Sequence, residues 1–132
     1  MSLVEIVSKF LEDQSKGIEG TNLFCYSFGE GVENGILVTS TGGISPQRFI
    51  DGDNRRINQT FINIMIRDSS KSAALLIAED LIKLFEKNTI TNCVSNKPRR
   101  EEPIYIGEEK TINGLIYLFG IDLMIRTVSN NL

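Results

Sequence analysis

The chain has 132 residues, 41% of them hydrophobic and 23% charged, which is typical of one globular domain and excludes disordered and fibrous classes. A formal net charge of −3 and a pI near 5.0 exclude the general attraction to phosphate backbones that free nucleic-acid binding requires. The sequence contains no histidine, which excludes Ser-His and Cys-His catalytic mechanisms as they are normally built.

The first predicted element is a short helix. Apolar residues recur at helical spacing from Leu3 to Leu11, with Ser2 as the N-cap and Glu5 at the third helical position. Gly17 and Gly20 are expected to end it. The N-terminus lacks the basic region and long apolar run of a signal peptide, and no window approaches the roughly 20 apolar residues of a membrane span. We therefore expect a cytoplasmic protein that does not cross a membrane.

Two predicted strands follow the helix. Residues Asn22 to Gly29 alternate, and their aromatic side chains are expected to meet the core. An Asn34-Gly35 pair is typical of a turn, and the β-branched run from Ile36 to Thr41 predicts a second strand, closed by Gly42-Gly43. We expect these strands to form a hairpin.

The middle of the chain predicts a long loop, a strand and a helix. The segment from Ile44 to Arg56 is rich in turn residues and arginine and has no periodicity, which favours a loop. Alternation from Ile57 to Arg67 predicts a half-buried strand. Asp68-Ser69-Ser70 provides a helix cap, and an apolar stripe predicts a helix as far as Lys87, ended by Asn88.

The C-terminal third predicts mostly extended structure. We expect a short strand near Ile90 to Val94, a polar loop from Ser95 to Glu102, an extended segment from Pro103, and a long strand from Gly114 to Thr127. One face of that strand is uniformly apolar, and Ser129 to Leu132 should fray. The whole order predicts one α+β domain over residues 1–132, with a single mixed, mainly antiparallel sheet packed by two helices.

No group of residues has the spacing of a catalytic or metal site. Cys25 and Cys93 lie far apart and outside zinc or redox motifs, so we interpret them as reduced packing residues. The Asp51, Asp53 and Asn54 segment resembles part of a calcium loop but lacks its closing glutamate, which favours a solvated turn. We predict no catalytic residue, no cofactor and no metal.

Charged clusters leave two interpretations open. Glu30 with Glu33, and Glu101-Glu102 with Glu108-Glu109, suit either an acid–base pair in a dry pocket or, as we favour, solvated loops. Two groups of cations suit either partner docking or ordinary solubilisation. They are Arg48, Arg55 and Arg56 in the long loop, and separately Lys97, Arg99 and Arg100.

The order of elements resembles the minor capsid and tail-terminator proteins of long-tailed, siphovirus-like phages. The residues that carry the resemblance are the N-terminal helix, Thr41-Gly42-Gly43 with Pro46, the strand ending at Ile64-Met-Ile-Arg67, the helix from Ser69 to Phe85, Pro103-Ile-Tyr-Ile-Gly107, and Tyr117 to Ile125. Two departures are a missing proline-containing segment before the second strand and an unusually charged loop from Asn96 to Glu102.

This resemblance implies a structural protein of the virion tail or neck, present in the host cytoplasm during assembly. It implies a homo-oligomeric ring, usually a hexamer, that caps the head-proximal end of the tail tube, ends polymerisation and docks the head. The partners would be the ring's own copies, the major tail tube protein and a head-completion or connector protein, with DNA only passing through the lumen. A closed ring needs two different patches per subunit. Our candidates are Glu30, Glu33, Asn34, Gln47, Arg48, Phe49, Arg55 and Arg56.

Two alternatives remain. The chain could be another phage neck or head-completion protein, because small α+β ring proteins of that region share an architecture. It could also be a small enzyme or ligand-binding domain that uses Asp122, the polar residue that interrupts the apolar C-terminal strand.

Overall fold

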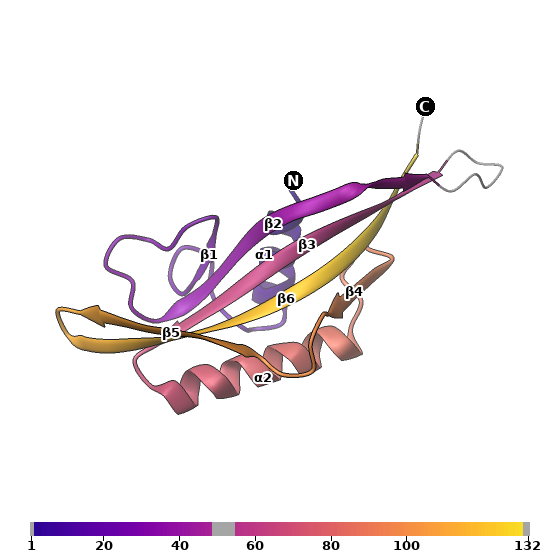
Figure 1. The fold of residues 1–132 in the computed structure, drawn as a ribbon. Helices are drawn as coiled ribbons and strands as arrows, with labels where there is room; N and C mark the ends of the chain where they lie inside the picture. Colours follow the sequence, from indigo (N-terminus) through magenta and orange to yellow (C-terminus); the bar gives the residue numbers. More distant parts are fainter. Residues whose placement is uncertain (1, 49–54, 131–132) are drawn as a thin grey trace.

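The structure, a computed structural model, describes the backbone of residues 2–48 and 55–130 and the side chains of residues 2–40 and 57–128. Its strands form one mixed sheet in the order β1-β2-β3-β6-β4, with β5 also paired to β6. Helices α1 and α2 pack against one face of this sheet, so the α+β fold is confirmed (Figure 1). In chain order the elements are α1 (Leu3–Asp13), β1 (Leu23–Cys25), β2 (Gly35–Arg48), β3 (Arg55–Asp68), α2 (Lys71–Lys87), β4 (Ser95–Pro98), β5 (Ile104–Thr111) and β6 (Gly114–Asn130).

Three long antiparallel strands form the middle of the sheet. β3 pairs with β6 from Arg55↔Asn130 to Asp68↔Tyr117, and with β2 on its other side. The predicted long loop from Ile44 to Arg56 is therefore wrong over most of its length, because β2 continues to Arg48 and β3 begins at Arg55. Residues 49–54 lie outside the described residues.

Glycine and proline in this segment are accommodated within the ladder instead of ending it. Gly42 and Gly43 pair with Phe61 and Thr60, so the prediction that they close the strand is wrong. The register shifts between Ser40 and Gly42, and again between Ile44 and Gln47. Such bulges place turn-forming residues in a strand without breaking it.

The N-terminal strands differ from the predicted hairpin. β1 pairs with β2 in parallel over Leu23↔Ile36 to Cys25↔Val38, so the hairpin is wrong. The predicted aromatic core face is also wrong, because Leu23 is fully buried whereas Tyr26 is 58% exposed. α1 covers the face of the sheet to which Leu23 points, and this tertiary contact decides which side of the strand is buried.

Both helices begin where their caps predict. The Ser2 hydroxyl accepts a hydrogen bond from the Glu5 backbone N–H at 3.2 Å, and the Ser70 hydroxyl accepts one from that of Ala73 at 3.3 Å. α1 ends earlier than predicted, at Asp13, with Ser15 at φ +61°. The helix therefore ends before Gly17 and Gly20, which we expected to end it, and Ser15 has the left-handed conformation after its last turn.

The core lies between the helices and the sheet. Ile62, Ile64 and Ile66 of β3 are fully buried, as predicted for one face of this strand. The predicted apolar face of β6 is only partly buried, because Leu115 at its start is 44% exposed. Ile116 and Leu118, on the opposite face, are buried instead.

The segment after α2 also differs from prediction. The strand predicted near Ile90 to Val94 is absent from the structure at those residues, and β4 forms within the predicted polar loop. Asn96 of β4 is buried, and its side chain binds the end of α2. β5 and β6 form a hairpin, and β5 confirms the extended segment predicted from Pro103.

Candidate functional site

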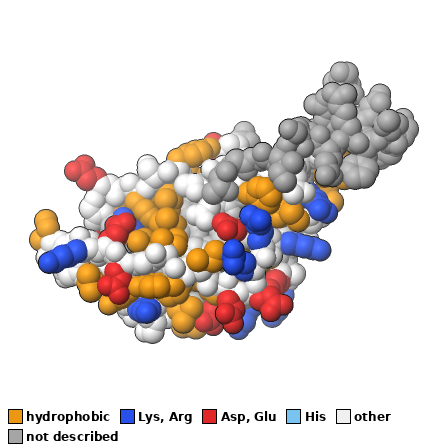
Figure 2. All heavy atoms as spheres, in the orientation of Figure 1, with side chains coloured by type: hydrophobic (Ala, Val, Ile, Leu, Met, Phe, Trp, Pro, Cys, Tyr) orange, Lys and Arg blue, Asp and Glu red, His pale blue; other side chains and the backbone are white. Residues whose placement is uncertain are grey.

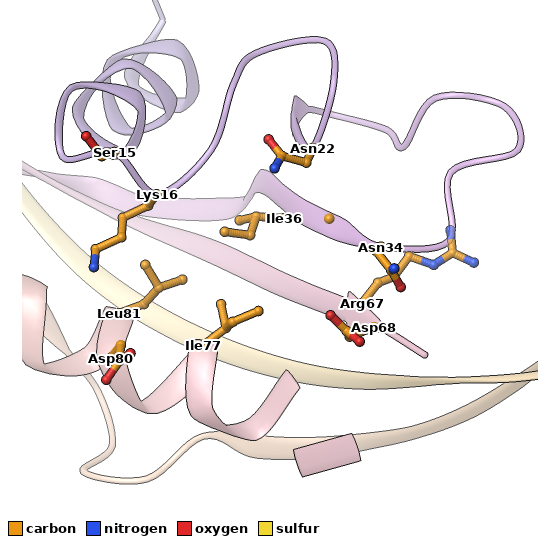
Figure 3. Close-up of a pocket in the computed structure, with 11 residues that line it drawn as sticks. Ser15, Lys16, Asn22, Asn34, Ile36, Arg67, Asp68, Ile77, Asp80 and Leu81 are labelled. Carbon is orange, nitrogen blue, oxygen red and sulfur yellow. The ribbon is translucent and has the colours of Figure 1, made fainter. Parts of the chain in front are cut away.

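A cavity beside the start of α2 is structural in character. A pocket of about 290 Å³ lies between the end of α1, the adjoining ends of β2 and β3, and α2 (Figure 3). Its polar groups stabilise the start of α2: Asn34 Oδ1 accepts from Ser69 N at 2.9 Å, and Asp68 Oδ1 from Ser70 N at 2.8 Å. The Arg67 guanidinium points away from the pocket. Asn34 and Asp68 therefore serve to hold the start of α2.

The other candidate chemical groups have ordinary structural surroundings. In residues 2–48 and 55–130, no three His, Cys, Asp or Glu side chains gather as a metal site would require. Cys25 and Cys93 are free and half-buried, and burial raises the pKa of the Cys93 thiol, which makes it less nucleophilic. Asp122 accepts a hydrogen bond from Asn63 Nδ2 at 2.8 Å within the sheet. The predicted calcium-like segment lies outside the described residues.

The first group of predicted interface residues lies in the connection between β1 and β2. Glu30 is exposed. Glu33 Oε1 accepts a hydrogen bond from Asn113 Nδ2 at 3.1 Å, which ties this connection to the β5–β6 hairpin. Asn34 holds the start of α2. Two of the three residues therefore stabilise the subunit itself.

The second group lies at the other end of the sheet. Gln47 pairs with Ile57 and Arg48 with Arg56, and Arg55 begins β3 beside them, whereas Phe49 lies outside the described residues. β2 runs from one group to the other, and at about 3.3 Å per residue it separates them by roughly 40 Å. The structure thus brings the described residues of each group together and keeps the two groups apart.

Two free strand edges are features that the sequence did not predict. Among the described strands, only β1 pairs with the outer edge of β2, over Ile36–Val38, and no described strand pairs with that edge from Gly42 to Arg48. β5 likewise pairs only with β6 within the described part of the chain. An unpaired edge is a template for another strand. The edge of β2 could have been predicted from the sequence only if the short parallel pairing of β1 with β2 had been predicted correctly.

No described helix covers the face of the sheet opposite α1 and α2. Phe61, Met65 and Met124 are half-buried there, and the Arg99 guanidinium lies 4.6 Å from the centre of the Phe61 ring. Hydrophobic side chains gather over this face with lysines and arginines beside them, and acidic side chains follow the lower edge (Figure 2). A surface of this kind suits contact with another protein.

Comparison of the chain with protein-family models and with curated proteins gives no match. Neither described helix is long and apolar enough to cross a membrane.

Proposed function

We propose that this protein is a structural subunit of a phage or prophage tail. Its copies form a ring, hexameric by the resemblance described above, that caps the head-proximal end of the tail tube, ends tube polymerisation and allows head attachment. The partners are further copies of the chain, the tube protein and a head-completion protein, and DNA passes through the lumen.

The observation that supports this proposal best is the outer edge of β2 from Gly42 to Arg48, with which no described strand pairs. A long unpaired edge exposes backbone N–H and C=O groups, and natural proteins cover such edges or use them for assembly. The free side of β5 is a second, different edge at the other margin of the sheet. A head-to-tail ring requires two different patches on each subunit, and their contact closes into a ring when the rotation between neighbours is a whole fraction of a full turn.

The charge of the chain also suits the proposed lumen. A net charge of −3 offers no general attraction to DNA, so DNA can pass without being held. The side chains of Asp122, Asn34 and Asp68 form hydrogen bonds that stabilise the subunit. These structural roles agree with a function that depends on contacts between surfaces.

The proposal is tested with the purified full chain and with the tube protein encoded beside it. Light scattering after gel filtration should show a concentration-dependent oligomer, and electron micrographs should show rings. Added to polymerising tube protein, the chain should shorten the tubes and lie at one end of each. A chain that stays monomeric at high concentration and leaves tube length unchanged would refute the proposal. Capture of a portal or connector protein in place of the tube would favour another neck protein.

A further inference from the structure

The tip of the β5–β6 hairpin is the most exposed apolar feature of the described chain. Four of the ten exposed large hydrophobic side chains in the described residues lie on this hairpin, and Ile112 at its tip is fully exposed. The exposed Lys110 lies two residues before it. The hairpin extends beyond the body of the sheet at the end opposite β4 (Figure 1). The residues of this group are Tyr105, Ile106, Ile112 and Leu115.

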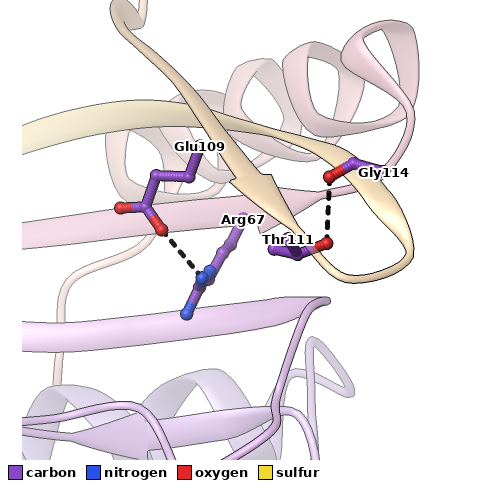
Figure 4. A network of polar contacts seen from close by, with 4 residues as sticks. All are labelled: Arg67, Glu109, Thr111 and Gly114. Carbon is purple, nitrogen blue, oxygen red and sulfur yellow. Dashed lines mark hydrogen bonds and ion pairs between the residues drawn. The ribbon is translucent and has the colours of Figure 1, made fainter.

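Specific contacts hold the tip in one orientation. The Thr111 hydroxyl donates to the Gly114 carbonyl at 3.0 Å, which closes the two-residue turn. Arg67 of β3 forms an ion pair with Glu109 of β5 at 3.0 Å (Figure 4). The Arg67 side chain is itself only 16% exposed. On the other side, Asn113 donates to Glu33. A tip fixed in this way loses little conformational entropy on binding.

A groove elsewhere on the subunit has complementary properties. It measures about 610 Å³ and lies between α2 and the connection from β4 to β5. Leu75, Ile82 and Pro103 supply apolar surface. Four glutamates and one lysine carry its charge: Glu79, Glu86, Glu101, Glu102 and Lys83. An acidic groove with apolar walls fits an apolar side chain accompanied by a cation.

We propose that the hairpin tip of one copy binds in this acidic groove of the next copy. Ile112 packs against Leu75, Ile82 and Pro103, while the Lys110 ammonium lies among the carboxylates. The tip extends away from the groove of its own subunit, and its Asn113 is bound to Glu33 of the same subunit. The tip that enters the groove therefore belongs to another copy. The contact joins two unlike surfaces, as a ring requires. This inference rests on the proposed ring.

Charge and shape select a second copy as the occupant. The groove carries four glutamates and one lysine, so it favours a part of the surface that brings a cation together with apolar surface. The cations Lys97 and Arg99 lie beside the flat open face, where Arg99 stacks on Phe61. Lys110 alone among these three adjoins a projecting, fully exposed hydrophobic residue.

Charge exchange tests the contact. In the full chain, Lys110→Glu and the double change Glu101→Lys/Glu102→Lys should each raise the concentration for half-assembly about tenfold or more, because like charges then face each other. Combining the three changes should restore assembly. Ile112→Ser should also weaken assembly, and Lys9→Glu on α1 is the matched control that should not. Light scattering measures assembly, and thermal melting confirms that each variant folds.

The outcomes separate this inference from the proposed function. A wild-type chain that never assembles overturns the ring and this contact together. Rings that form equally well in wild type, Lys110→Glu and Ile112→Ser overturn the contact alone. Single variants that fail to assemble without recovery in the combined variant reject the pairing of tip with groove. Variants that form normal rings but no longer bind tail tubes would assign the tip to the tube protein instead.

Discussion

The buried side chain of Asn96 should stabilise the fold strongly, although it lies in a segment whose composition is that of a polar loop. Its Oδ1 accepts from the Ile90 backbone N–H at 2.7 Å, and its Nδ2 donates to the carbonyls of Phe85 at 3.1 Å and Asn88 at 2.8 Å. Asn96→Ala removes all three bonds and leaves the buried Ile90 N–H and Phe85 carbonyl without that partner.

The size of the effect follows from the burial of these groups. A net hydrogen bond contributes about 1 kcal/mol, and a buried polar group left unsatisfied costs about 1–3 kcal/mol. We therefore expect Asn96→Ala to lower the free energy of unfolding by roughly 2–4 kcal/mol, a large part of the roughly 5–15 kcal/mol typical of a domain. With urea m-values of about 1–3 kcal/mol per molar, the unfolding midpoint should fall by roughly 0.7–4 M.

Urea unfolding followed by circular dichroism measures this change. Asn88→Ala is the matched control, because the Asn88 amide donates to the Leu84 carbonyl at 3.0 Å on an exposed surface, where water can replace it. We expect the control to lower the free energy of unfolding by about 1 kcal/mol or less. An Asn96→Ala protein within about 0.5 kcal/mol of wild type would refute the reasoning, since that is the range of ordinary surface substitutions.

Three further outcomes are expected. Ile64→Ala should lower the free energy of unfolding by roughly 2–5 kcal/mol, because Ile64 is fully buried, and an unchanged urea midpoint would contradict this. Ser70→Ala should lower it by about 1 kcal/mol through loss of the α2 N-cap, whereas Ser69→Ala, which keeps the backbone donor to Asn34, should leave it nearly unchanged in the same assay. Because burial raises the pKa of the Cys93 thiol, its reaction with a disulfide reagent at pH 8 should be slower than that of free cysteine and should keep accelerating toward pH 9.5; equal rates at pH 8 would contradict this.

Local patterns predicted the elements whose signals lie within one segment. The β3-to-α2 unit is the clearest case: alternation buries Ile62, Ile64 and Ile66, and the cap at Ser70 begins the helix. Hydrophobic periodicity and capping act between neighbours in the chain, so they are visible without tertiary structure.

Long-range pairing decided the elements that were predicted incorrectly. β1 pairs in parallel with β2, and the supposed loop from Ile44 to Arg56 is largely strand because β3 and β6 extend the ladder beside it. Turn-forming residues disfavour a strand, but here the pairing with neighbouring strands outweighs that preference. Asn96 was assigned to a loop for the same reason, since only its partners on α2 and Ile90 make its burial favourable.

The candidate surfaces divide in the same way. Composition and local patterns already indicated a histidine-free, acidic α+β chain without a catalytic motif and with charged segments available for docking. The three-dimensional structure was needed to show that Glu33 and Asn34 support the subunit and that no described strand pairs with the edge of β2 from Gly42 to Arg48. It was also needed to show that Ile112 projects from a hairpin held by specific contacts, far along the chain from the α2 part of the acidic groove. The physical reason is that exposure and complementarity depend on which distant segments cover one another, and no local pattern records that.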